Sequence, residues 1–312
     1  MKTMKKFAIA GLAVISVWQL SSATGSRLSG AYLGQAPPGR TAVLFAPGDL
    51  STADPEICIS FAPDGKEIFY TVGGLPHSVI LHRRETGAFW TEPKVAPFSG
   101  RYSAECQLSP DGMKMFFCSG MPASGRGEPK GNWNIWMAER KIGGSWGIPL
   151  RLNSPLGSDD FSADCPSVAA NGSVYFYSAN YPGGRGKGDL YVSRLVDGAY
   201  QTPENLGPAV NTEHYDMDPF IAPDESYLVF SSSRPGGLGE NDLYVSFRGK
   251  DGAWTPARNL GPEINSAAME IHPFVSRDGK YLFFSSTRRI AYPRHSESPL
   301  TLEGKVEWLT RP

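Results

Sequence analysis

One hairpin pattern occurs five times along this chain of 312 residues and constrains its fold more than any other feature. Each copy has a short apolar run, a turn rich in Pro, Asp, Asn and Gly, and a second run of aromatic and β-branched residues. This order is typical of a β-hairpin, because Pro fixes φ early in the turn and Gly accepts a positive φ near its end. The copies begin at Ile59, Gln107, Ser167, Phe220 and Phe274. Regular recurrence predicts a repeat architecture.

Two further strands are expected in each repeat. Third strands begin at Ser78, Asn134, Asp189, Asp242 and Lys305. Fourth strands, each an aromatic residue followed by Pro and an apolar-x-Pro step, begin at Phe89, Ser145, Tyr200 and Trp254. Proline favours an edge position for these fourth strands, because a missing N–H costs least there.

The last repeat lacks a fourth strand, and the missing piece is found at the other end of the chain. Residues 40–51 have the same apolar-x-Pro ending and precede the first hairpin. The sequence therefore predicts an all-β fold, a five-bladed β-propeller of four-stranded antiparallel blades. An N-terminal strand pairing on the last blade would close its ring.

The first residues have the order of an export signal. Lys2, Lys5 and Lys6 precede an apolar run over 7–17, which is too short to span a bilayer, and small residues follow at 21–23. We expect a signal peptide at 1–23, a linker at 24–39 and the propeller at 40–312. A buried N-terminal helix is the alternative. The mature chain is expected in the periplasm or outside the cell, with no membrane span.

Charge and cysteine content narrow the partners. The chain has 30 Lys and Arg against 31 Asp and Glu and no basic block, so nucleic acid is not an expected partner. Four cysteines allow two disulfides in three connectivities. Cys106 and Cys118 fall on neighbouring strands, but no bond is assigned. We expect a monomer.

The hairpin turns carry a family resemblance. "APDG" at 62–65 and "SPDG" at 109–112 resemble the WD-like repeats of periplasmic TolB-type β-propellers, over residues 40 to about 309. The turns depart from that pattern at Ala170-Asn171, Glu225 and Arg277. The resemblance implies exported binding or scaffold proteins, and it supplies no catalytic set.

Matched positions of the first strands define the candidate site, because these strands line the channel of a propeller. Seven residues before each turn Gly or its equivalent stand Cys58, Glu105, Cys165, Asp218 and His272. Thiolate, imidazole and carboxylate ligands suit zinc or another transition metal, with Cys58, Cys165 and His272 as metal candidates. The alternative is a structural ring of polar side chains that bind channel water or free backbone N–H groups.

Three carboxylates two residues earlier are further ligand-binding candidates. They are Glu56, Asp216 and Glu270, which we expect on the same strand face as the ring. For Asp216 and Glu270, the alternative is a turn at the start of the strand, in which the carboxylate accepts backbone N–H groups.

Three functions follow from these patterns. No HExxH or phosphate-loop motif occurs, which favours a binding or scaffold protein over an enzyme, with a protein, peptide or glycan at the channel mouth. The first alternative is a carbohydrate-active hydrolase or lyase that uses Asp218, Glu105, Glu56 or Glu270. The second is a metal-binding protein; no other cofactor is expected.

Overall fold

The computed structural model describes residues 28–52, 54–74, 77–100, 102–122, 131–153 and 156–287, and the backbone of 304–307. Residues 1–23 lie outside this range, so the signal peptide stays a prediction. The proposed boundaries of the linker after residues 23 and 39 also stay predictions.

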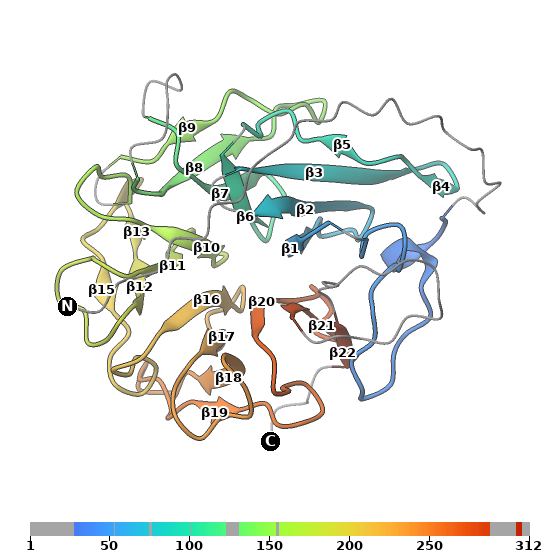
Figure 1. Ribbon diagram of the computed structural model, residues 1–312. Coiled ribbons are helices and arrows are strands. Elements are labelled where there is room, and N and C mark those ends of the chain that lie inside the picture. The colour runs from blue at the N-terminus through green and yellow to red at the C-terminus, as the bar shows by residue number, and fades with distance from the viewer. Residues whose placement is uncertain are drawn as a thin grey trace, which may run out of the picture.

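Antiparallel sheets stand side by side around a central axis, each with its first strand innermost (Figure 1). The first sheet contains β1 (Glu56–Phe61), β2 (Glu67–Gly74), β3 (His77–Thr86), β4 (Phe89–Trp90) and β5 (Lys94–Val95). The second contains β6 (Ser103–Leu108), β7 (Lys114–Ser119), β8 (Asn134–Glu139) and β9 (Leu150–Arg151). The third contains β10 (Asp164–Val168), β11 (Val174–Ser178), β12 (Asp189–Ser193) and β15 (Glu204–Asn205).

The remaining strands continue the same order around the axis. The fourth sheet contains β16 (Asp216–Ile221), β17 (Tyr227–Ser232), β18 (Asp242–Phe247) and β19 (Arg258–Asn259). The last contains β20 (Glu270–Val275), β21 (Tyr281–Ser286) and β22 (Gly304–Glu307). A separate small hairpin is formed by β13 (Leu195–Val196) and β14 (Ala199–Tyr200). The all-β propeller arrangement is thus confirmed. Four sheets have a full set of blade strands, whereas the last has three among the described residues.

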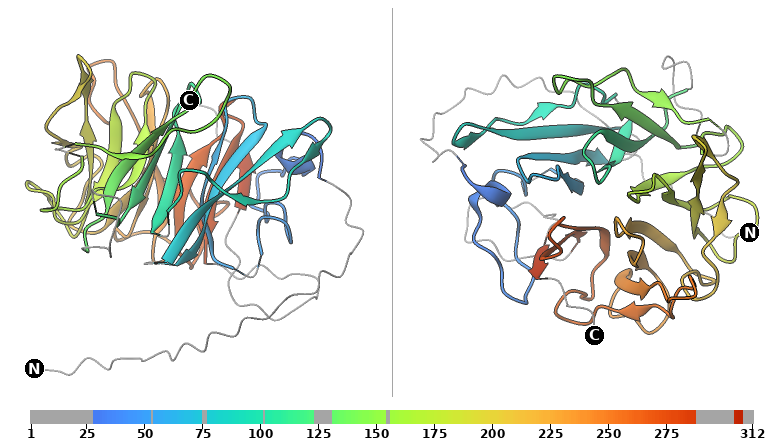
Figure 2. Two further views of the ribbon diagram at one scale, coloured as in Figure 1. Left: turned by 90° about the horizontal axis from the view of Figure 1, so that it is seen from above. Right: turned by 180° about the vertical axis from the view of Figure 1, so that it is seen from behind.

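The core lies between neighbouring sheets. Phe69 of the first sheet packs with Phe117 and Trp136 of the second, and Phe230 of the fourth packs with Tyr175 of the third. The innermost strands also touch in circular order, and β20 of the last sheet contacts β1 of the first. The view from behind in Figure 2 shows the same circular arrangement.

The described part of the N-terminal segment packs between the first and last sheets (Figure 1). It includes the short 3-10 helix η1 (Ala31–Gly34). The Phe45 side chain is fully buried, and its ring centroid lies 6.0 Å from that of Phe61 and 5.1 Å from that of Phe283. Trp90 Nε1 donates a hydrogen bond to Gly30 O at 2.9 Å. This packing places the segment against the last sheet, while its pairing there as a strand stays a prediction.

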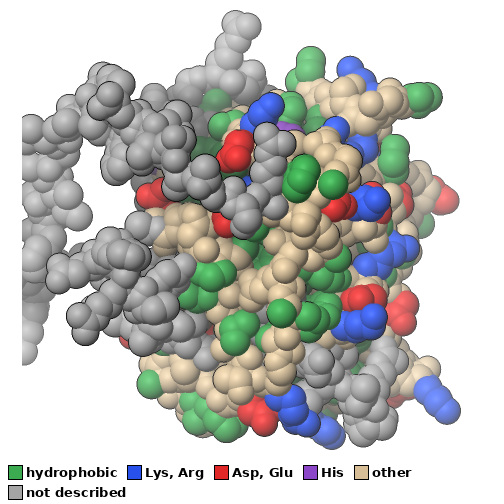
Figure 3. Space-filling model, turned by 90° about the vertical axis from the view of Figure 1, so that its right-hand side faces the viewer, with side chains coloured by type: hydrophobic (Ala, Val, Ile, Leu, Met, Phe, Trp, Pro, Cys, Tyr) green, Lys and Arg blue, Asp and Glu red, His purple; other side chains and the backbone are tan. Residues whose placement is uncertain are grey.

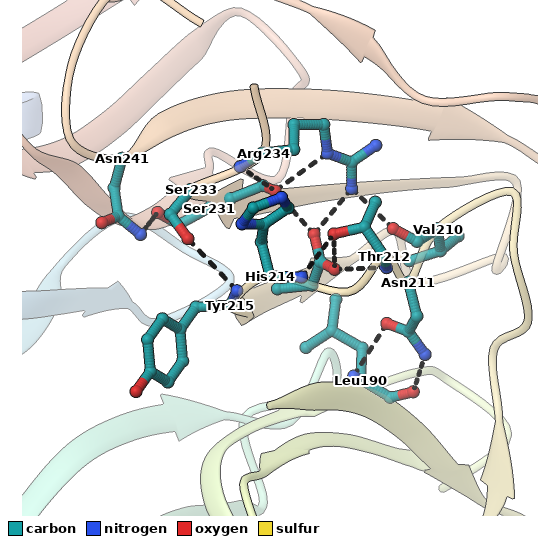
Figure 4. Close-up of polar contacts among 12 residues, drawn as sticks. Leu190, Val210, Asn211, Thr212, His214, Tyr215, Ser231, Ser233, Arg234 and Asn241 are labelled. Carbon is teal, nitrogen blue, oxygen red and sulfur yellow. Dashed lines mark hydrogen bonds and ion pairs between the residues drawn. The ribbon is translucent and has the colours of Figure 1, made fainter. Parts of the chain in front are cut away.

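Repeated side-chain contacts tie the fourth-strand segments to the sheets. Asn211 accepts the Leu190 N–H through Oδ1 and donates through Nδ2 to Leu190 O, both at 2.9 Å (Figure 4). Asn265 makes the same pair of bonds to Leu243 one sheet further. The asparagine side chain therefore fixes the segment after the fourth strand to the third strand of each of these two sheets.

On the face shown in Figure 3, side chains of both signs are interspersed rather than gathered by sign. Within the described residues, no helix has the length and apolar character needed to cross a membrane.

Candidate functional site

The inner strands share an unusual backbone at the predicted ring positions. Left-handed φ values between 50° and 54° occur at Cys58, Glu105, Cys165, Asp218 and His272. Each of these residues lies where the pairing of its inner strand with the next strand shifts register. A non-glycine residue in this region costs about 1–2 kcal/mol, so such conformations persist only where surrounding structure enforces them. The register shift re-aims one side chain from each inner strand.

Four of these side chains contact one another across the channel, and Cys58 lines the same cavity. Cys165 Sγ lies 3.1 Å from Glu105 Oε2 and 3.0 Å from Asp218 Oδ1. Asp218 Oδ1 in turn lies 3.4 Å from His272 Nδ1, and Cys58 Sγ donates to the backbone oxygen of Cys106 at 3.1 Å. The structure therefore brings together the predicted ring residues, which come from five different inner strands.

The ring encloses a small cavity. Its volume is about 30 Å³, and its lining includes all five ring residues and the prolines that follow three of them. A water needs roughly 10–15 Å³ of such space. One or two waters or a single ion fit there, but an organic ligand does not.

Burial contributes to the raised pKa values of Cys58, Cys165 and Asp218. It raises the pKa of the Cys165 thiol well above its ordinary value, and the Glu105 and Asp218 carboxylates raise it further. The hydrogen bond to Cys106 and burial raise the pKa of Cys58 in the same direction. Burial also raises the pKa of Asp218, although His272 opposes the shift. In the protein alone, the thiols are thus protonated at neutral pH and are not activated nucleophiles.

All four cysteines are free thiols. Cys106 and Cys118 lie on the adjacent strands β6 and β7, as expected, and are buried. Cys118 Sγ lies 3.0 Å from Glu105 Oε2, so this thiol contacts the ring through Glu105.

The same cavity argues against glycoside hydrolysis by Glu105 and Asp218. A glycosidase places its two carboxylates about 5 to 9.5 Å apart on either side of a sugar. Here both carboxylates touch one thiol within about 30 Å³ of space. A sugar ring does not fit between them.

The three earlier carboxylates lie apart from this cavity. Each is buried and accepts hydrogen bonds from a Thr or Ser four residues before it: Glu56 from Thr52, Asp216 from Thr212 and Glu270 from Ser266. Asp216 also accepts from Arg234 at 2.7 Å. These hydrogen bonds form a turn at the start of each strand, which is the structural alternative to a ligand-binding role. The expected common strand face fails because the register shift between the two positions breaks the alternation of side chains.

A second cavity was not predicted from the sequence. It has a volume of about 600 Å³ and adjoins the ring, with Gln107 and Phe274 lining both. Phe61, Phe220 and Phe274 contribute to its wall, and turns of the inner hairpins form its rim. The guanidinium of Arg277 donates across this mouth to Pro110 O. The available signal was the recurrence of large apolar residues two or three positions after each ring residue.

Comparisons with known proteins agree on the fold. No family model matches the chain, and no curated protein matches it. A putative TolB from Agrobacterium tumefaciens superposes with a TM-score of 0.50 at 19% identity, covering 75% of this chain and 71% of that one. TolB from Acinetobacter baumannii gives 0.50 at 15% identity, covering 81% of this chain and 54% of its own.

An α-L-arabinofuranosidase from Podospora anserina gives a TM-score of 0.52 at 12% identity, covering 87% of this chain and 98% of that enzyme. Identities this low show the fold alone, because propellers carry many unrelated functions. The fold is a β-propeller similar to that of TolB proteins.

Proposed function

We propose that this chain is an exported five-bladed propeller that binds a peptide segment of a protein partner at its apolar channel mouth. The cavity of about 600 Å³ carries this proposal. Binding pockets typically measure about 300–1,000 Å³ and have mainly apolar walls with a few polar groups. The proposal places the propeller at 40–312, with residues 40–51 as the closing strand of the last blade.

The polar groups of the mouth favour an apolar side chain over a sugar. Ser109 and Ser276 already donate through their hydroxyls to Asp111 and Asp278, each at 2.6 Å. Gln107 accepts the Val168 N–H at 2.6 Å. Because a sugar needs many hydrogen-bond partners and these groups are engaged, a peptide with a large apolar residue fits the mouth better.

Export rests on the first residues and on the fold. The order of charged, apolar and small residues over 1–23 is that of a signal peptide, and the resemblance implies an exported protein. The proposed site lies in the periplasm or outside the cell.

Peptide binding is tested with a displayed library selected on the full chain, followed by calorimetry with the synthetic peptides. Ala31→Trp places an indole at the mouth, since Ala31 is exposed and lines it. We expect it to weaken binding at least about tenfold, which is 1.4 kcal/mol. Ala253→Trp is the matched control, because Ala253 is exposed in a turn outside the mouth.

Two results would overturn the proposal. One is a set of selected peptides that bind Ala31→Trp and Ala253→Trp equally well. The other is a glycan array in which a sugar, rather than any peptide, binds the chain and is excluded by Ala31→Trp.

A further inference from the structure

We propose that Glu105, Cys165 and His272 form a binding site for one divalent cation of the zinc type at the centre of the channel. One donor atom from each residue lies within 4.8 Å of the others. The three residues belong to β6, β10 and β20, so the site exists only in the folded propeller. This site is separate from peptide binding at the mouth, and either proposal can fail alone.

The donor types select the metal. Thiolate sulfur, imidazole nitrogen and carboxylate oxygen together suit zinc, whereas calcium and magnesium take oxygen ligands alone. Zinc bonds of about 2.0–2.3 Å in a tetrahedron place neighbouring donors roughly 3.3–3.8 Å apart. The 3.1 Å between Cys165 Sγ and Glu105 Oε2 is close to this spacing. The remaining donors would close by about 1 Å, which small side-chain rotations supply.

Asp218 takes the part of a positioning residue. Its Oδ1 lies 3.4 Å from His272 Nδ1, and its Oδ2 lies 3.4 Å from the His272 backbone N–H. Histidine ligands usually donate their second ring N–H to a carboxylate, which fixes the tautomer and the ring orientation. With Nδ1 held by Asp218, the proposal assigns metal binding to His272 Nε2.

The left-handed backbone supports a binding role. Cys165 and His272, with φ of 50° and 51°, would each gain stability if the chain carried Gly there. A side chain with donor atoms instead lines the cavity of about 30 Å³, which has room for one ion. Cys58 of the same ring does not belong to the donor group, and its thiol contacts Cys106 O.

The site is tested by titrating the metal-free full-length protein with Co²⁺, which reports thiolate ligation through a near-ultraviolet charge-transfer band. Wild type should bind one Co²⁺ with this band, and one Zn²⁺ should displace it. Cys165→Ser should abolish the band, whereas the matched variant Cys58→Ser should keep it. Asp218→Asn should keep the band but weaken Zn²⁺ binding about 10–100-fold.

The wild-type titration alone can refute the proposal, so it does not depend on the folding of any variant. Saturating Co²⁺ without a thiolate band would overturn it. A band of unchanged strength in Cys165→Ser would do so too, because the thiolate would then come from another residue.

Discussion

Glu67 connects the first two sheets through a buried ion pair, and neutralising it should destabilise the protein in a pH-dependent way. Arg140 Nη2, just after β8, lies 2.6 Å from Glu67 Oε2, and Arg84 Nη2 lies 3.1 Å from Oε1. Glu67 is only 5% exposed. Although burial opposes it, the nearby His82 side chain and the hydrogen-bonded Arg140 guanidinium lower the pKa of Glu67 from 4.5 to about 2. Each pKa step of one corresponds to 1.36 kcal/mol, so the charged form contributes about 3 kcal/mol.

The sign of the pH dependence follows from the lowered pKa. The contribution is complete above pH 4.5, the ordinary value for Glu67, and is lost as the pH falls toward about 2. Urea unfolding of Glu67→Gln should therefore show a loss of about 3 kcal/mol at neutral pH that shrinks over this range. Glu139→Gln is the control, because Glu139 is 63% exposed and its pairing with Lys114 is worth at most about 1 kcal/mol. An equal loss for Glu67→Gln at neutral pH and near pH 2 would refute the reasoning.

Three further substitutions test how the sheets are joined. Glu225→Gly relieves a φ of 58° but removes the carboxylate that two arginines and Tyr175 share. Thermal denaturation should therefore show a net loss of about 2 kcal/mol in stability, and a gain in stability would contradict this. Phe45→Ala removes a buried ring between the first and last sheets and should cost about 3–5 kcal/mol in urea unfolding, whereas a loss under about 1 kcal/mol would mean that the segment does not hold them together. Trp90→Phe removes the hydrogen bond to Gly30 O and should speed hydrogen exchange over 28–35, and unchanged exchange there would show that this bond does not anchor the segment.

The repeat predicts the ring positions because each one lies at a fixed distance in sequence from a hairpin turn. Pro, Asp and Gly fix each hairpin turn, and counting back from the turn reaches the same backbone position in every inner strand. Residue type gave no sign that Cys58 or His272 adopts a left-handed φ, since neither is a glycine. The register shift is therefore invisible in the sequence. Without the shift, the alternation of a regular strand would place Glu56 on the same face as Cys58.

At Glu225, the sequence rule for hairpin turns predicts less stability than the packed structure provides. A turn with Glu in place of Gly predicts a weak hairpin, because the left-handed region disfavours a side chain. The structure uses that side chain to bind Arg194 at 2.7 Å and Arg248 at 3.1 Å, which follow directly after β12 and β18. Neither arginine is near Glu225 in the sequence, so only the packed arrangement of blades shows the compensation. The cavity at the mouth is hidden from the sequence for the same reason. Phe220 and Phe274 begin two separate hairpins, and only the packing of neighbouring blades places them around one cavity.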